Sequence, residues 1–353
     1  MTYRQAQGLG AHFRIAQEAV DWLAATTIID SGAAKAPAER GAAALPKEVR
    51  GHLHSRGVFS VAVKTSASAI GADLMRGYQM TKSSFPLTPP AALVTASKKG
   101  GTGKTFLMAT VADLMTVNGY SYSVFQADDK MRLRTLIGAK VVELRPNPDL
   151  VMNNPALMRQ AFTPFYTACS EAMASGKSVL FDIGANEVEN AANFLTDVEI
   201  YEDLVSWGLP MIVFVLVQAE TDAIASAAET IRRFRSAVPS ARLVLVENLL
   251  ERGPLGALRT TGPARHQFEK DLKPLLAGVT RVTMPAILPD FWEPYDNAGQ
   301  RFLKALAMEP KEAAKRLNME VGDVKIARRA VAVYFRSMHA ALSQLIVLPK
   351  GGV

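Results

Sequence analysis

The 353-residue chain lacks the cysteines of a disulfide framework and the long apolar runs of membrane spans. It has a single cysteine, Cys169, so no disulfide can form within the chain and a site of several thiolates is excluded. No apolar run reaches the roughly 18 residues of a transmembrane helix. The N-terminal stretch MTYRQAQGLGAHFRIAQEAVDW mixes polar and apolar residues where a signal peptide needs an apolar run. We therefore expect a cytoplasmic protein whose fold is held by packing alone.

Neither charge sign dominates the composition. Lysine and arginine number 40 against 33 acidic residues, which gives a net charge of +7, and 49% of the residues are hydrophobic. These values fit one large α/β domain with appendages. The positive excess permits an acidic partner, such as nucleic acid or an anionic membrane face, without requiring one.

The chain divides into four segments by composition. Residues 83–90, SSFPLTPP, predict a linker because serine and proline resist both helix and central strand. Residues 1–82 predict an N-terminal extension of helical and mixed character, to which the sequence assigns no role. From 91 to 308, short apolar runs alternate with helical patterns, which predicts a doubly wound α/β domain around a mostly parallel sheet. The pattern from 309 to 353 predicts a C-terminal helical segment with interspersed basic residues.

A glycine-rich loop lies between the first predicted strand of this domain and the helix that follows. The stretch 96–106 reads ASKKGGTGKTF. Its glycines allow backbone N–H groups to approach an anion, and the helix N-terminus adds the positive end of a dipole. In a phosphate-binding loop (P-loop) of this kind, Lys104 reaches the β- and γ-phosphates and the Thr105 hydroxyl holds Mg²⁺. A chance glycine-rich turn is the less favoured alternative.

The lysines of this loop carry a resemblance to a family. The run KKGGTGKT resembles the deviant Walker A loop of the ParA/MinD family of P-loop ATPases, whose pattern is Lys-Gly-Gly-x-Gly-Lys-Thr/Ser. The resemblance implies that Lys104 acts on the nucleotide of its own subunit. Lys99, the signature lysine, would act on the nucleotide of the partner in a sandwiched homodimer. Solvated charge is the alternative for Lys99 and the preferred interpretation for Lys98, which stands where the family has glycine. The resemblance places the nucleotide on Gly100, Gly101, Thr102, Gly103, Lys104, Thr105 and Phe106.

Two carboxylates are expected at the ends of the next strands. Asp128, in FQADDKMRL, matches the second Asp of the family pattern Asp-x-Asp-Pro-Gln, which implies that it positions the attacking water near the γ-phosphate. The sequence departs from that pattern at Gln126, Asp129 and Lys130, and capping of the following helix is the alternative role for Asp128.

The strand SVLFDIGAN resembles a Walker B strand. It would carry Asp182 to the carboxyl edge of the sheet, where the carboxylate holds Mg²⁺ directly or through water. The predicted metal site is therefore Thr105, Asp128 and Asp182, and the predicted catalytic set is Lys99, Lys104, Asp128 and Asp182.

Two later segments resemble the base-binding parts of the family. Asn248, in VLVENLL, resembles the asparagine on the adenine side, and MPAILPDFWEPYDNAG resembles a loop that covers the base through Pro289 and Asp290. The guanine signature Asn-Lys-x-Asp is missing after the strand of Asn248, which favours ATP over GTP.

The resemblance implies an ATP hydrolase that switches its own attachment to a cellular surface on and off. ATP binding drives dimerisation on a surface such as nucleoid DNA, and hydrolysis, stimulated by a partner protein, releases it in plasmid or chromosome partition or cargo positioning. The basic runs RRFRSAVPSAR and KIARRAVAVYFR offer phosphate contacts, although solvated helix faces explain the same arginines. An accessory ATPase of plasmid conjugation or mobilisation and an ATP-dependent synthetase are alternatives.

Attachment to a membrane is less favoured. The C-terminal helix presents Val331, Tyr334, Phe335 and Leu342, which could form the apolar face of a membrane-binding helix. Packing of this face against the core is the preferred interpretation.

Overall fold

The computed structural model describes residues 86–128, 130, 132–138, 140–144, 157–250 and 253–348. Within them, seven strands form one sheet in the order β3-β2-β4-β1-β5-β6-β7, and every neighbouring pair is parallel. The doubly wound α/β fold predicted from the sequence is confirmed. The strands are β1 (Ala92–Ala96), β2 (Tyr122–Ala127), β3 (Val141–Glu143), β4 (Ser178–Ile183), β5 (Met211–Val217), β6 (Arg242–Asn248) and β7 (Thr280–Met284).

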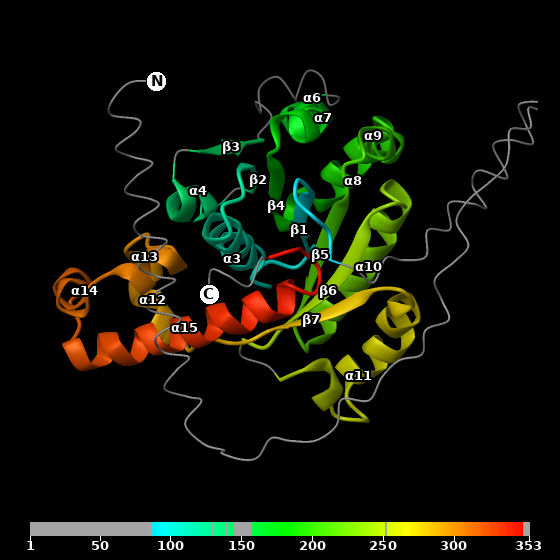
Figure 1. Cartoon of the computed structure of the whole chain (residues 1–353). Coiled ribbons are helices and arrows are strands. Elements are labelled where there is room, and N and C mark those ends of the chain that lie inside the picture. Colours follow the sequence, from blue (N-terminus) through cyan, green and yellow to red (C-terminus); the bar gives the residue numbers. More distant parts are fainter. Residues whose placement is uncertain are drawn as a thin grey trace, which may run out of the picture. The chain divides into compact units, whose positions relative to one another are not determined.

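Helices connect the strands and cover the sheet (Figure 1). They are α3 (Lys104–Val117), α4 (Arg132–Ile137), α6 (Leu157–Gln160), α7 (Thr163–Ser175), α8 (Val188–Asp197), α9 (Ile200–Trp207), α10 (Thr221–Ala237), α11 (Pro263–Gln267), α12 (Pro289–Asn297), α13 (Phe302–Ala307), α14 (Pro310–Leu317) and α15 (Val321–Leu342). Short helical turns are η1 (Ala185–Glu187), η2 (Leu255–Ala257), η3 (Phe268–Leu272) and η4 (Lys273–Leu276). No helix of the described residues is long and apolar enough to cross a membrane.

The central strands form because their side chains are apolar on both faces. All seven residues of β5, MIVFVLV, are buried, and so are all those of β1 and β4. A strand covered by helices on both sides needs a continuous apolar run rather than an alternating one. The edge strand β3 spans three residues and was not predicted, because so short a segment gives no periodic signal.

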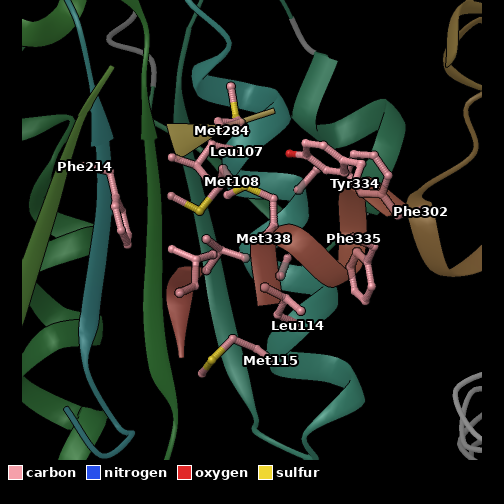
Figure 2. Packing of buried hydrophobic residues seen from close by; sticks show 14 of the residues in the cluster. Leu107, Met108, Leu114, Met115, Phe214, Met284, Phe302, Tyr334, Phe335 and Met338 are labelled. Atoms are coloured by element: carbon pink, nitrogen blue, oxygen red, sulfur yellow. The ribbon is translucent and has the colours of Figure 1, made fainter. Parts of the chain in front are cut away.

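Each face of the sheet has its own hydrophobic core. One face packs against α3, α4, α12, α13 and α15, and the other against α7, α8, α9 and α10. Figure 2 shows the first core, in which Tyr334 and Met338 of α15 lie against Leu107 and Met108 of α3.

The C-terminal helices belong to the sheet domain. The four apolar residues that would have formed a membrane-binding face of α15 are no more than 1% exposed, so the preferred interpretation, packing on the core, is confirmed. The predicted C-terminal helical segment is present as α14 and α15. The predicted linker is also anchored in part, because Leu87 forms a parallel bridge with Ile346.

The strand order reverses beside β1. The chain builds one side of the sheet with β4, β2 and β3, and the other side with β5, β6 and β7. In open α/β sheets, ligands bind outside the carboxyl ends of the strands at such a switch point. The glycine-rich loop follows β1, so it lies at this position.

Candidate active site

The loop after β1 has a backbone that only glycine adopts readily. Gly103 has φ 94° and precedes α3 directly. A Cβ at Gly103 would lie 2.7 Å from Asn248 Nδ2, so both conformation and packing require glycine there. Among the described residues, no side chain caps the N-terminus of α3. The first N–H groups of a helix lack intrahelical partners, so they are suited to an anion.

Lys104 crosses its own loop. Its ammonium donates to the carbonyls of Ser97 at 3.0 Å and Lys99 at 3.1 Å, and the residue is only 6% exposed. Burial lowers the pKa of Lys104, while the charges of Asp182 and Asp128 oppose that effect. An ammonium has three donors, and these two carbonyls leave one for an incoming ligand.

Asp182 and Thr105 are brought together as predicted. The Thr105 hydroxyl donates to Asp182 Oδ2 at 2.7 Å, which joins the first turn of α3 to β4. Thr95 donates to Oδ1 at 2.7 Å. Burial raises the pKa of Asp182, and the bonds from the two threonines and the charge of Lys104 oppose this effect. Because Thr105 gives its only proton to the carboxylate, its oxygen lone pairs stay available to a cation.

Asp128 lies at the neighbouring strand end. Its Oδ1 accepts a hydrogen bond from the backbone N–H of Lys130 at 3.0 Å, which closes a local turn two residues ahead of α4. Gly184 makes the approach possible, since a Cβ there would lie 2.7 Å from the Ala127 carbonyl and 3.0 Å from Asp128 Cγ. The charge of Asp128 acts on both Lys104 and Asp182, so the predicted group is assembled in space. Asp129 lies outside the described residues.

The residues of the predicted metal site fit a hard cation. Thr105, Asp128 and Asp182 offer hydroxyl and carboxylate oxygens, the donors that Mg²⁺ prefers. The 2.7 Å bond between Thr105 and Asp182 brings two of these donors together at the carboxyl edge of the sheet. The donor chemistry therefore agrees with magnesium.

Lys98 and Lys99, at the start of the loop, contact carboxylates of α10 and of the residue before it. Lys99 Nζ lies 3.6 Å from both Glu220 Oε1 and Asp222 Oδ2, at the start of α10. Lys98 Nζ donates to Glu229 Oε1 at 2.7 Å. Lys98 is therefore paired and partly buried rather than simply solvated, because α10 supplies a carboxylate beside it. The role of Lys99 across a dimer stays a prediction.

Lys98 takes part in a network of ions. Arg233 also contacts Glu229, at 2.9 Å, and Glu189 of α8, at 3.2 Å. The network joins the loop entry to two helices on the same face of the sheet. No sequence pattern indicates this network, since its residues are far apart in the chain.

Other predicted nucleotide contacts have partners within the protein. Asn248 Nδ2 donates to the Thr102 carbonyl at 3.0 Å, and its Oδ1 accepts from Leu250 N–H at 3.0 Å. Asn248 thus braces the back of the loop. Thr102 is fully buried, whereas Gly100 and Gly101 are exposed at the tip. The predicted adenine contact of Asn248 is not tested by these bonds.

Phe106 faces the core. Its ring packs against those of Trp292, Phe302 and Tyr334, with centroids 5.0 to 5.6 Å apart. The side chain therefore serves the junction of α3 with α12, α13 and α15. A contact of Phe106 with nucleotide would have to come from its backbone.

Pro289 and Asp290 begin α12, where both are exposed. Asp290 lines an open pocket of about 620 Å³ together with Glu293 of α12 and Arg316 of α14. None of the loop residues lines this pocket. Coverage of the base by Pro289 and Asp290 stays a prediction.

The arginines of the first basic run have protein partners. Arg232 donates to the Asp271 carbonyl at 3.3 Å and Arg235 to the Leu275 carbonyl at 2.8 Å. Burial lowers the pKa of Arg242. Arg232 and Arg235 thus link α10 to η3 and η4, a structural role that requires no DNA. Contacts with DNA stay a prediction.

Thr95 is a site residue that the sequence analysis did not single out. It is fully buried on β1 and holds Asp182. A polar residue within the apolar run AALVTAS is the signal that could have revealed it. The pairing itself depends on the register between β1 and β4, which places Thr95 beside Asp182.

Comparison with known proteins returned matches only among solved structures. No protein-family model and no curated protein matches the chain. A MinC:MinD cell division protein complex from Aquifex aeolicus matches with 15% identity and a TM-score of 0.38, covering 71% of this chain and 96% of that one. MinD from the same organism matches with 13% identity and a TM-score of 0.35, covering 71% and 97%.

An ATP complex of McdA(D38A) from Cyanothece also matches. The identity is 10% and the TM-score 0.36, with 65% of this chain and 97% of that chain covered. MinD gives its name to the family that the loop resembles. These TM-scores lie below 0.5, so the functional proposal depends on the residues of this chain.

Proposed function

We propose that this protein is a ParA/MinD-like ATPase that binds Mg-ATP on the loop 98–105 and hydrolyses it. The observation that carries the proposal is the bond between Thr105 and Asp182, 2.7 Å long, beside the buried ammonium of Lys104. A helix N-terminus, a lysine and a hydroxyl paired with a strand-end carboxylate are the parts that P-loop phosphoryl transfer needs.

Each residue has a task that follows from its position. Lys104 places a positive charge on the β/γ-phosphate region, and the N–H groups at the start of α3 bind phosphate oxygens. Asp182 accepts a hydrogen bond from the Thr105 hydroxyl and so leaves the lone pairs of that oxygen for the metal ion. Asp128 accepts a hydrogen bond from the attacking water and orients it toward phosphorus. Magnesium, when bound with the nucleotide, neutralises charge on the phosphate oxygens.

The dimer belongs to the same proposal. The Lys99 ammonium lies beside carboxylates at the start of α10, and its side chain is 37% exposed. A lysine that is exposed at a loop entry is accessible to a second subunit. In a sandwiched homodimer it would add a charge to the partner's phosphates, which in related phosphoryl transfers is worth about 10³-fold or more in rate.

The surface to which the dimer attaches is proposed to be DNA. The net charge of +7 favours a polyanion, and non-specific binding to phosphates needs no base readout. The exposed basic side chains of α14 and α15, among them Lys315, Lys325 and Arg329, supply positive charge. Hydrolysis, stimulated by a partner protein, would then release the protein from DNA during partition or cargo positioning.

The test measures the mass of the protein with and without nucleotide, and its binding to non-specific DNA. Light scattering should give the mass of a monomer without nucleotide and of a dimer with Mg-ATP, and the dimer alone should bind non-specific DNA. Mg-GTP should have a weaker effect than Mg-ATP. A mass that is unchanged by Mg-ATP refutes the dimer, and equal responses to the two nucleotides refute the adenine preference.

A further inference from the structure

Gln126 lies in the site but is not part of the predicted catalytic set. It is 1% exposed and sits on β2 opposite Asp182 of β4 in the parallel register. Side chains two residues apart on a strand share a face. Val124 and Leu180 lie in the core beneath α3, so Gln126 and Asp182 are neighbours on that same face.

The amide nitrogen of Gln126 holds the turn that carries Asp128. Nε2 donates to the Lys130 carbonyl at 3.0 Å, while Asp128 Oδ1 accepts from the Lys130 N–H at 3.0 Å. A carbonyl only accepts hydrogen bonds, so the nitrogen of the amide must face it. Lys130 is therefore held through its N–H by Asp128 and through its carbonyl by Gln126.

The amide oxygen of Gln126 is a buried acceptor. Among the described residues, Oε1 has no hydrogen-bond partner. An unpaired buried acceptor costs about 1 to 3 kcal/mol, and such atoms are nearly always satisfied by protein or water. Asp182 cannot serve, because an ionised carboxylate only accepts hydrogen bonds, here from Thr105 and Thr95. Within the described residues no donor reaches Oε1, so it is available to water or to a ligand at the sheet edge.

We propose that Gln126 is a positioning residue for hydrolysis. Its amide nitrogen fixes the turn that aims Asp128, and its amide oxygen accepts a hydrogen bond from water in the nucleotide complex. The inference rests on the proposed ATPase function and deepens it. It also gives a physical use to a glutamine that stands where the resembled family has aspartate.

The first measurement separates turnover from binding. Gln126→Met keeps the length of the side chain and removes both polar atoms. We expect kcat to fall about tenfold, because the positioning hydrogen bonds of both amide atoms are lost, while the Kd of Mg-ATP stays within about twofold of the wild-type value. Gln126→Leu, which has a different shape, should likewise lower kcat and leave the Kd of Mg-ATP nearly unchanged.

Gln300 supplies a matched control. It is a buried glutamine, 2% exposed, whose Nε2 donates to the Ala298 carbonyl at 2.6 Å between α12 and α13. Gln300→Met should lower the melting temperature about as much as Gln126→Met does and leave kcat unchanged. If both variants reduce kcat equally, the effect of Gln126 is one of general stability and the inference is overturned.

A double-mutant cycle tests whether Gln126 acts through Asp128. In an Asp128→Ala background, Gln126→Met should cause no further loss of kcat, since the residue it positions is already gone. If the double variant loses kcat by the product of the two single losses, the residues act independently and the inference is overturned. If the wild-type protein binds Mg-ATP but does not hydrolyse it, the proposed ATPase function is itself overturned. This outcome is distinct from failure of the Gln126 inference alone, in which the wild type hydrolyses ATP.

Discussion

At the scale of single residues, two lysines five positions apart have different surroundings. Lys104 is buried and donates to two loop carbonyls, whereas Lys99 faces two carboxylates at the start of α10. The predicted grouping of Lys104, Thr105 and Asp182 is present in the structure, because the motif itself fixes a strand, a loop and a helix in sequence. The partners of Lys98 and Lys99 could not be predicted, since they come from α8 and α10.

Loss of the Lys104 ammonium should abolish binding of Mg-ATP. Lys104→Ala removes the only positive side chain buried within the described part of the loop, where a charge-assisted hydrogen bond to phosphate is strong. Titration calorimetry with Mg-ATP measures the effect. Lys177→Ala, which removes an exposed lysine ahead of β4, is the control and should bind as the wild type does. Comparable affinities for both variants would show that the phosphates bind elsewhere.

At the scale of elements, a buried ion pair joins α3 to the start of α13. Arg301 contacts the fully buried Asp113, and Leu303 N–H donates to Asp113 Oδ2 at 3.2 Å. Arg301 also donates to Thr116 and Tyr122, each at 3.3 Å. The pair therefore fixes the helix of the P-loop to the helices that follow β7.

Removal of one partner of this pair should destabilise the protein strongly. Asp113→Ala leaves a charged guanidinium partly buried, which costs about 3 to 5 kcal/mol in the free energy of unfolding. Urea unfolding followed by circular dichroism measures it. Glu171→Ala, at an exposed position of α7, should change stability by no more than about 0.5 kcal/mol. A loss below about 1 kcal/mol at Asp113 would mean that water reaches the site.

A histidine on α15 should make stability depend on pH. Burial lowers the pKa of His339 below its ordinary value of 6.5, and its Nε2 has no hydrogen-bond partner among the described residues. The unfolded chain then binds the proton more tightly, so the free energy of unfolding decreases as pH falls below about 6.5. Urea midpoints between pH 8 and 5 (about 1.5 units either side of that pKa) should fall less in His339→Gln than in the wild type or in His266→Gln, an exposed control. Parallel curves for all three would exclude His339 as the cause.

The elements were predictable to different degrees for physical reasons. The sequence indicates six of the seven described strands, most clearly where the run is apolar throughout, as in β5. A helical pattern resumes at the start of α14, so the sequence predicts a segment boundary there. Only packing reveals that α15 completes the core of the sheet, since an amphipathic helix does not specify which surface covers its apolar face.

At the scale of the whole molecule, the direction in which Lys99 acts can be settled by mixing. Lys99→Ala and Asp128→Ala should each hydrolyse ATP only at a small residual rate while still binding Mg-ATP. In their heterodimer, the site with an intact Asp128 receives its lysine from the Asp128→Ala subunit. ATPase activity should therefore reappear on mixing, up to about a quarter of the wild-type rate for random pairing with one of two sites active.

The control for this experiment is pairing itself. Native gels should show that the two variants form a heterodimer with Mg-ATP. If they pair and remain inactive, Lys99 acts within its own subunit, and the sandwiched arrangement is wrong for this chain.

The bridge between Leu87 and Ile346 has a mechanical consequence. Leu87 N–H donates to the Leu345 carbonyl at 2.7 Å, and Val347 N–H donates to the Leu87 carbonyl at 2.8 Å. The first and last described residues of the sheet domain thus lie side by side. Tension applied between residues 86 and 348 loads these two hydrogen bonds before it reaches any strand of the sheet. A pull along the chain would detach the two ends from each other while the P-loop, α3 and β4 keep their arrangement.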